Sequence, residues 1–377
     1  MLEVSSIAFN LLHRMRKILL FSIVIILFGC SKDDGGNSSV CSNSLEVTDK
    51  INGGSILQTW KLVHGRNTAS EDIIRTIDLV QKTNASWVSL SPGIGISDKS
   101  EQFPPVRYEF PVSAEIEKMK VIIPKIINSG ITNIMLKPLT SFGDIGVNNS
   151  GFWGDFYVDT EEKWKEVESA YTDLFYEFAN LSNEFPEVKL LSVGNELKEF
   201  TTRRPEFFKV LILKIKADFP DLQLTYAANW NEYQSVSFWD DLDFIGVNPY
   251  FPLINKETPT VDEVKQALVP IKNDLTELSC SNQKPILFTE YGYRSIDFGA
   301  WEAWNLGDVT TSNHNFETQN NAYIAFYDVF WGEDWVAGGF FWEWKVLFNG
   351  EVNNPNENGW TINDKPVEEI IRDQYKG

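Results

Sequence analysis

Short apolar runs alternate along this chain with longer stretches in which apolar residues recur every three or four positions. The short runs carry few charges and stop at Gly, Pro, Asn or an acidic residue, which is typical of strands buried on both faces of a parallel sheet. Eight strands are predicted in this way, at residues 56–62, 87–90, 133–137, 189–195, 223–228, 244–247, 285–290 and 338–342.

Most of the longer stretches predict amphipathic helices between these strands. The clearest covers 160–182 and places large apolar residues on one face. Further helices are predicted at 70–80, 113–130, 205–219, 261–278, 317–330 and, after the last strand, 367–375. This order of strands and helices predicts an α/β protein with the architecture of a (β/α)8 barrel. No internal repeat divides the pattern, so residues 53–377 are expected to form one folded domain.

The amino-terminal segment does not follow this pattern. Three basic residues within 14–17 precede an apolar run over 18–28, which is too short to span a bilayer and fits the core of a signal peptide. The run ends in Leu-Phe-Gly-Cys30, which resembles a bacterial lipobox. Residues 1–30 are therefore expected to be a lipoprotein signal, with Cys30 as the lipidated residue. Residues 31–52 are rich in Ser, Gly, Asn and Asp and predict a flexible tether.

The residues directly after Cys30 indicate a destination. Ser31-Lys32-Asp33-Asp34 resembles the acidic export signal of surface lipoproteins of the Bacteroidetes type. The expected location is the bacterial cell envelope, as an outer-membrane lipoprotein exposed at the surface. The leaflet that holds the anchor is left open.

Composition narrows the possible partners. The chain has 377 residues and a formal net charge of -20, so it would repel a phosphate backbone, and nucleic acid is not an expected partner. The three His are scattered without metal-binding spacing, so no metal site is expected. No other cofactor is expected either. Cys41 and Cys280 could pair in an oxidising compartment, but their spacing does not decide this.

Two glutamates stand at the ends of predicted strands. Glu196 follows the fourth strand and Glu290 ends the seventh. Catalytic groups of (β/α)8 barrels lie at the carboxyl ends of the strands, so the two carboxyl groups could face each other across one pocket. Either glutamate alone could instead be a surface carboxylate or a helix-start residue. Their shared placement favours catalysis.

Two facing carboxyl groups suit the hydrolysis of a glycosidic bond. At a separation of roughly 5 to 5.5 Å, one attacks the anomeric carbon and the other protonates the leaving oxygen, with retention of configuration. Glu196 follows an apolar strand, which suits the proton-bearing acid/base. Glu290 has candidate hydrogen-bond donors nearby that would keep a nucleophile ionised: Tyr250, Tyr291, Tyr293 and Arg294.

Several segments resemble one family. Residues 226–230, 238–247, 250–253, 287–295 and 339–342 are similar to glycoside hydrolase family 113, a family of β-1,4-mannanases. Asn-Glu after strand four and Glu after strand seven is also the arrangement of the clan of retaining (β/α)8 glycosidases. The resemblance implies Glu196 as acid/base and Glu290 as nucleophile. It also implies β-linked mannan or mannooligosaccharide as substrate, and no metal requirement.

The same comparison suggests supporting residues. Asn195 would contact the sugar at the cleaved bond, Tyr250 would orient the nucleophile, and Trp342 would form a stacking floor. Three more residues end or follow strands and are candidates for lining the cleft, with packing as the alternative role: Trp230, Trp153 and Lys137. The long loop over 139–159 is expected to wall the cleft.

Other functions remain open. A β-glucanase or xylanase would use the same barrel and the same two carboxylates. A surface lipoprotein that binds glycans without cleaving them is the rival from another class, although loss of one carboxylate would be its expected mark. Endo or exo action, branch tolerance and the oligomeric state are not decided by the sequence.

Overall fold

The computed structural model describes residues 45–56, 76–78, 80–97, 107–108, 112–142, 152–305, 313–346 and 358–376. The predicted signal peptide, Cys30 and most of the predicted tether lie outside these ranges, as does the start of the helix predicted at 70–80. Among the described helices, none combines the length and apolar character needed to cross a bilayer.

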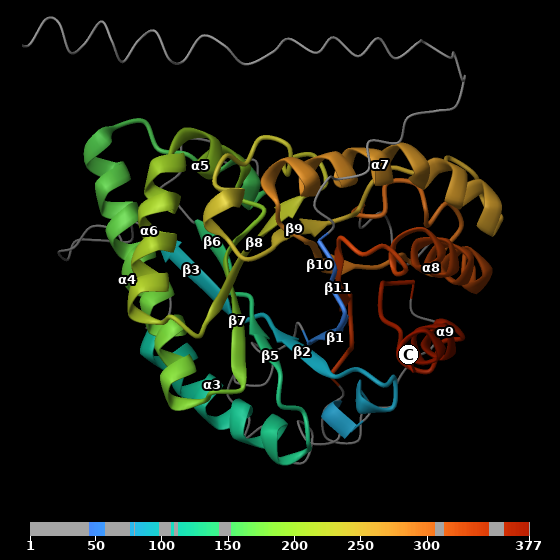
Figure 1. The fold of residues 1–377 in the computed structure, drawn as a ribbon, viewed down its shortest axis with the longest axis horizontal. Coiled ribbons are helices and arrows are strands. Elements are labelled where there is room, and N and C mark those ends of the chain that lie inside the picture. Colours follow the sequence, from blue (N-terminus) through green and yellow to red (C-terminus); the bar gives the residue numbers. More distant parts are fainter. Residues whose placement is uncertain are drawn as a thin grey trace, which may run out of the picture. The chain divides into compact units, whose positions relative to one another are not determined.

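Within the described residues, eight parallel strands close into a barrel (Figure 1). In order around the barrel they are β1 (Ile51–Ile56), β2 (Trp87–Leu90), β5 (Ile134–Leu136), β7 (Val188–Asn195), β8 (Gln223–Asn229), β9 (Ile245–Asn248), β10 (Ile286–Tyr291) and β11 (Val336–Phe341). The last strand pairs with the first. The predicted (β/α)8 architecture is confirmed.

Helices surround this barrel (Figure 1). They are α3 (Val112–Asn128), α4 (Glu161–Glu184), α5 (Lys198–Arg203), α6 (Pro205–Asp218), α7 (Val261–Asn282), α8 (Phe316–Phe330) and α9 (Val367–Gln374). Side-chain caps mark the start of α4, α7 and α8. At the start of α8, the Asn315 side chain accepts the Thr318 N–H. The Thr160 hydroxyl accepts the Lys163 N–H at the start of α4, and Thr260 forms a capping box with Glu263 at the start of α7.

The predicted position of the first strand was wrong. β1 covers Ile51–Ile56, whereas the sequence pattern placed the strand at 56–62 and ended the tether at residue 52. Gly53 and Gly54 sit in the middle of β1, where a Cβ would collide with the rings of Phe340 and Phe341 on β11. Bulky β11 side chains fill the space that β1 leaves, so β1 has too few large apolar residues to be recognised by hydrophobicity.

The end of the predicted tether is also held in place. The Val47 N–H donates to the Asp334 carbonyl at 3.0 Å, and Lys50 donates to the carbonyls of Glu333 and Val336. These bonds fix the chain before β1 against the start of β11. Cys280, near the end of α7, is disulfide-bonded. Cys41, with which the sequence left a pairing open, lies outside the described residues, so that pairing stays a prediction.

A small second sheet was not predicted. β3 (Gly93–Ser97), β4 (Arg107–Tyr108) and β6 (Leu139–Phe142) form it, in the order β4-β3-β6. β3 follows β2 and β6 follows β5, so this sheet lies in loops at the carboxyl ends of barrel strands. Phe142 of β6 stacks on Phe156 at 3.7 Å between ring centroids, so the loop over 139–159 begins and ends in ordered packing.

The barrel interior changes in character along the strands. One layer is apolar and contains Ile51, Met135, Leu190, Leu287, Ala337 and Phe340. Toward the carboxyl ends, buried side chains become polar: Lys137, Asn195, Glu196, Asn248, Thr289 and Glu290. The apolar layer closes the barrel from below, and the polar layer forms the floor of the site.

Candidate active site

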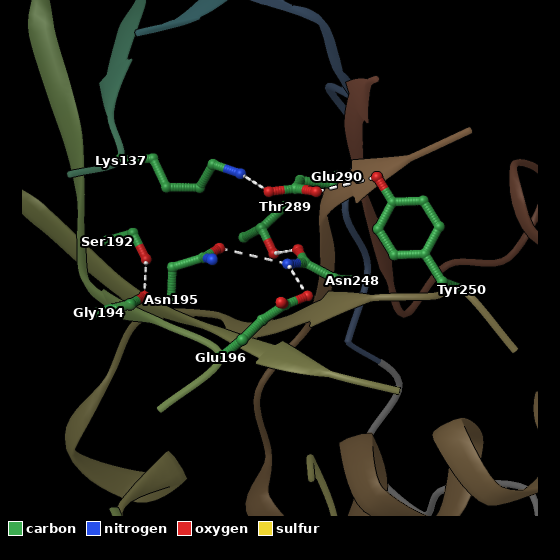
Figure 2. A network of polar contacts seen from close by, with 9 residues as sticks. All are labelled: Lys137, Ser192, Gly194, Asn195, Glu196, Asn248, Tyr250, Thr289 and Glu290. Atoms are coloured by element: carbon green, nitrogen blue, oxygen red, sulfur yellow. Dashed lines mark hydrogen bonds and ion pairs between the residues drawn. The ribbon is translucent and has the colours of Figure 1, made fainter. Parts of the chain in front are cut away.

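The structure brings Glu196 and Glu290 together. Glu196 directly follows β7, and Glu290 lies near the end of β10. Both carboxyl groups point into the same space at the centre of the barrel (Figure 2), with relative exposures of only 8% and 5%. Two carboxyl groups buried this closely interact strongly, so their surroundings decide which one carries a proton.

Each oxygen of Glu290 has its own donor. Lys137, directly after β5, forms a buried ion pair with Oε1. The Tyr250 hydroxyl, two residues after β9, donates to Oε2 at 2.9 Å. Burial lowers the pKa of Lys137, while the neighbouring Glu290 charge acts in the opposite direction. The bonds from Lys137 and Tyr250 fix the orientation of the Glu290 carboxylate.

Glu196 has a different environment. Its Oε1 accepts one bond, from Asn248 Nδ2 at 3.0 Å. Burial raises the pKa of Glu196 to about 8, with repulsion from Glu290 as the second cause, and the Asn248 bond and Lys137 oppose the shift. At neutral pH Glu196 therefore holds a proton beside a carboxylate that is paired with a lysine.

Asn248 links the two halves of the site. The Thr289 hydroxyl donates to Asn248 Oδ1 at 2.7 Å, and Asn248 Nδ2 also lies 3.3 Å from Asn195 Oδ1 (Figure 2). Thr289 precedes Glu290, and Asn195 precedes Glu196. A single amide thus ties the end of β10 to the end of β7, and it holds both carboxyl-bearing segments in register.

The backbone at Glu196 is turned. Its φ is 55°, in the left-handed region that residues with a side chain seldom adopt. The pairing of β7 with β8 shifts register between Ser192 and Asn195, as at a β-bulge, and such bulges re-aim side chains. Gly194 permits this, because a Cβ there would lie 2.7 Å from the Tyr171 hydroxyl. The turn directs the Glu196 carboxyl into the barrel mouth.

The other predicted site residues divide into two groups. Asn195, Tyr250 and Lys137 belong to the hydrogen-bonded network (Figure 2), and the partly buried Trp342 ring lies 4.7 Å from Lys137 Nζ. Trp230 and Trp153 are not part of the network that Figure 2 draws.

The two outlying tryptophans have aromatic neighbours. Trp230 stacks on Trp304 with 4.8 Å between ring centroids, so one face of its indole is covered. Trp153 is 41% exposed and packs beside Phe152. Both follow the carboxyl ends of barrel strands, so a role in lining the cleft remains a prediction for each.

Two of the predicted donors to Glu290 point elsewhere. The Tyr291 hydroxyl pairs with those of Tyr327 at 2.9 Å and Tyr375 at 2.5 Å. Arg294 donates to the backbone carbonyls of Asn358 and Asn305. Successive side chains of a strand point to opposite faces, so Tyr291 faces the helices when Glu290 faces the barrel interior. Prediction of these donors was wrong, and Lys137 takes their place.

Sequence reasoning missed Asn248 and Thr289. Their signals were nonetheless present, because Asn248 ends β9 as Asn195 ends β7, and Thr289 directly precedes Glu290. In the part of the chain that the structure describes, no group of three His, Cys, Asp or Glu side chains has the arrangement of a metal site.

A family model decides which enzymes this chain is related to. The model described as Glycoside Hydrolase Family 113 matches residues 58–365, which is most of the chain. The chain belongs to glycoside hydrolase family 113. A search of curated proteins gave no match for this family 113 chain.

Solved structures agree with the family 113 fold. The GH113 β-mannanase AaManA from Alicyclobacillus acidocaldarius, solved in complex with ManMIm, has 18% identity and a TM-score of 0.65, covering 87% of this chain and 97% of its own. Another GH113 β-1,4-mannanase, solved as a complex, has 18% identity and a TM-score of 0.66, covering 88% of this chain and 100% of its own. The β-glucuronidase of Faecalibacterium prausnitzii has 16% identity and a TM-score of 0.58, covering 88% and 50%. At these identities the likeness concerns the fold.

The buried ion pair in this family 113 enzyme has a testable energetic consequence. Lys137→Met leaves the Glu290 charge buried without its cation, which costs about 3 to 5 kcal/mol in comparable pairs. We expect the free energy of unfolding, measured by urea denaturation at pH 7, to fall by about 3 kcal/mol. Lys272→Met is the matched control. It breaks the Lys272–Glu333 pair, whose side chains are about a third exposed, so the expected loss is under about 1 kcal/mol. Equal losses would contradict the prediction.

Proposed function

We propose that this glycoside hydrolase cleaves β-1,4-mannosidic bonds of mannan or mannooligosaccharides with retention of configuration. The observation that carries the proposal is the contrast between the two buried carboxyl groups. Glu196 holds a proton, and Glu290 is paired with Lys137 and Tyr250. Retaining glycosidases require this division into an acid and a nucleophile. Membership in family 113 and the β-mannanases of similar fold support mannan as the substrate.

In the first step, a Glu290 oxygen attacks the anomeric carbon of the sugar. The bond from that carbon to the glycosidic oxygen breaks, and Glu196 gives its proton to this oxygen as the shortened chain leaves. In the second step, Glu196 takes a proton from water, whose oxygen attacks the anomeric carbon. The ester bond to Glu290 breaks, and the carboxylate is restored. Two inversions at one carbon give net retention.

The change of role at Glu196 follows from the same electrostatics. In the free enzyme, repulsion from Glu290 contributes to the raised pKa of Glu196. Once Glu290 is esterified it carries no charge, so this contribution disappears and the pKa of Glu196 falls. The residue that served as acid then serves as base without any movement of the backbone.

The neighbouring residues have distinct parts in the proposed reaction. Tyr250 and Lys137 hold the two oxygens of Glu290, so that the attacking lone pair has a fixed direction. Asn195 uses its carbonyl oxygen toward Asn248, which leaves its amide group to donate to a sugar hydroxyl. Trp342 is partly exposed beside Lys137 and offers an aromatic face to the sugar ring.

The raised pKa of Glu196 predicts the alkaline limit of activity. Glu196 must be protonated to act as acid, and its pKa of about 8 means that the proton is lost as the pH rises through that value. We therefore expect kcat/KM for mannooligosaccharides to fall tenfold for each pH unit above about 8. A series of initial rates from pH 5 to 10, with stability checked at each pH, measures this limit. A decline beginning near pH 5 would contradict the assignment of Glu196.

A comparison of polysaccharides tests the substrate. The purified protein is incubated with β-1,4-mannan, β-1,4-glucan and β-1,4-xylan, and reducing ends are quantified. We expect release from mannan alone. Preference for glucan or xylan would contradict mannan as the substrate but would agree with the two-carboxylate mechanism. Binding without release of sugar from any of the three would favour a glycan-binding protein.

The product pattern defines the reaction further. Proton NMR of the first products from mannohexaose shows the anomer, and β products are expected for retention. A ladder of oligosaccharides would indicate an open cleft and endo action. Mannose or mannobiose alone would indicate a cleft blocked at one end.

We also infer that the enzyme is held at the cell envelope by a lipid on Cys30, as the lipobox sequence indicates. Metabolic labelling with a radioactive fatty acid tests this. Incorporation is expected in the unaltered protein and not in Cys30→Ser, and equal labelling of both would exclude lipidation at this residue.

A further inference from the structure

A third carboxyl group lies buried near the two of the active site. Glu232 follows β8 and is only 1% exposed. Its Oε1 accepts bonds from the hydroxyls of Tyr226 and, at 3.1 Å, Thr201, and its Oε2 accepts the Asn229 N–H at 3.1 Å. Neither the sequence pattern nor the proposed reaction gives this carboxylate a task. Burying a carboxylate costs several kcal/mol, so its presence asks for an explanation.

Tyr226 connects Glu232 to the catalytic segment. Its hydroxyl donates to Glu232 and accepts the Leu197 N–H at 2.6 Å. Leu197 directly follows Glu196, and the Glu196 N–H donates to the Ala227 carbonyl at 2.8 Å. Two residues of β8, Tyr226 and Ala227, therefore accept the peptide N–H groups of Leu197 and Glu196, which lie on either side of the Glu196 side chain.

These two hydrogen bonds lie at the residue with the strained backbone, Glu196. Glu196 stands in the left-handed conformation, which is unfavourable for a residue with a side chain and persists only when its surroundings hold it. A hydroxyl that donates to a carboxylate is polarised and becomes a stronger acceptor. Glu232 thereby strengthens the hydrogen bond from the Leu197 N–H to the Tyr226 hydroxyl. A neutral side chain at position 232 would polarise the hydroxyl less.

The charge of Glu232 also reaches Glu196. Burial raises the pKa of Glu232 to about 7, against the hydrogen bonds from Tyr226, Asn229 and Thr201 and the nearby Lys198. Glu232 is thus ionised at the alkaline limit of activity, and its charge adds to the causes that raise the pKa of Glu196.

Other charged or titratable groups face these two carboxyl groups. Around Glu196 they are Glu290 on β10 and Lys137 after β5, with the Asn248 amide on β9. Around Glu232 they are Tyr226 on β8, Lys198 on α5 and Tyr171 on α4.

We propose that Glu232, acting through the Tyr226 hydroxyl, is a positioning residue that holds the Glu196 turn and sets both the direction and the acidity of the catalytic acid. This inference rests on the proposed function, in which Glu196 is the acid/base. Glu232 does not touch the substrate and acts only through its neighbours.

Glu232→Gln tests the charge while keeping the shape. We expect kcat to fall about tenfold, and the alkaline limit of kcat/KM to move down by about one pH unit, because a nearby negative charge is lost. Tyr226→Phe removes the acceptor for Leu197, and we expect a tenfold lower kcat with KM within about twofold of the unaltered enzyme. A role in stability alone would lower the melting temperature and leave the alkaline limit in place, which would overturn the proposal.

Asp218→Asn is the matched control. Asp218 also accepts a bond from a tyrosine, Tyr176, at 2.7 Å, but this pair is exposed and lies between α4 and α6. Removing its charge is expected to leave kcat and the alkaline limit unchanged. A shift in this control as large as that in Glu232→Gln would overturn the specific role of Glu232.

A second measurement separates this inference from the proposed function. Carbon NMR of protein labelled at the glutamate carboxyl carbon follows the titration of Glu196 without substrate, and its signal is assigned by its loss in Glu196→Gln. The Glu196 midpoint is expected to move down in Glu232→Gln. If the enzyme releases nothing from mannan, the proposed function fails, and the titration still decides the present inference.

An unchanged Glu196 midpoint in Glu232→Gln would overturn the inference. If that variant does not fold, Tyr226→Phe takes its place in both measurements. The midpoint should again move down, because Glu232 loses a hydrogen bond that stabilises its ionised form. An unchanged midpoint together with an unchanged kcat would then overturn the proposal.

Discussion

Glu290→Gln is expected to lower kcat on β-1,4-mannan by about a thousandfold or more, as loss of a nucleophile does in other enzymes. The amide has nearly the same shape, but it carries no charge and cannot form the glycosyl ester. It also leaves Lys137 buried without its anion. Release of reducing ends, followed over days for the variant and minutes for the unaltered enzyme, measures the loss.

Covalent trapping gives the same residue a direct test. A 2-deoxy-2-fluoro mannosyl fluoride should add one sugar mass to the unaltered enzyme, on a peptide that contains Glu290, and nothing to the variant. Glu333→Gln, which alters a surface carboxylate paired with Lys272, is the control and should retain full activity. If Glu290→Gln kept a tenth of the activity, or the label were found on another residue, Glu290 would not be the nucleophile.

Glu196→Gln is expected to lower kcat on mannan by a similar factor, but its defect should depend on the leaving group. The variant cannot protonate the leaving sugar oxygen, which would have to leave as an alkoxide, so cleavage of mannan fails in the first step. A dinitrophenyl mannoside needs no proton to leave, so formation of the glycosyl ester on Glu290 should continue, and the second step then becomes limiting because water lacks its base.

An external nucleophile distinguishes this defect from general damage. Azide needs no base, so it should restore turnover of the dinitrophenyl mannoside by Glu196→Gln and give a mannosyl azide of β configuration, which NMR can identify. The same addition should not restore the second step in Glu290→Gln. An α-azide, or no rescue, would contradict the assignment of Glu196 as acid/base.

The expected results for Glu290→Gln and Glu196→Gln both depend on one layer of polar side chains inside the barrel. Lys137 and Tyr250 deliver charge-assisted bonds to Glu290, and Asn248 offers only a neutral amide to Glu196. Because the two carboxyl groups share one buried space, ionisation of the first disfavours ionisation of the second. The proposed separation of roles therefore depends on Lys137, which follows the strand opposite β10 in the barrel.

The pattern of apolar runs was enough to predict seven of the eight barrel strands, their closure into a barrel, and the two glutamates at strand ends. A strand buried on both faces must be apolar along its length, so a carboxylate at its end is conspicuous, as at Glu196 and Glu290. Parallel strands that alternate with helices leave few possible architectures. The same argument explains why Asn195 and Tyr250, at or just after the ends of such strands, were candidates, and both lie in the hydrogen-bonded network; their contacts with a sugar stay a prediction.

Features that depend on contacts across the barrel were outside the reach of the sequence pattern. β1 was misplaced because its glycines are explained only by the phenylalanines of β11. Tyr291 and Arg294 were assigned to Glu290 because they are close in the chain, although alternation along the strand turns Tyr291 away. Lys137, more than 150 residues from Glu290, became its partner when the strands closed into a ring.

The charge states of Glu196 and Glu232 also depend on tertiary contacts. Whether Glu196 holds a proton depends on its burial and on its distance from Glu290. The role proposed for Glu232 depends on the Tyr226 hydroxyl, which accepts the Leu197 N–H. Periodicity records which face of an element is buried. Only the closed barrel determines which buried groups are in contact. The free energy of a charge in a protein interior depends on the charges and dipoles around it.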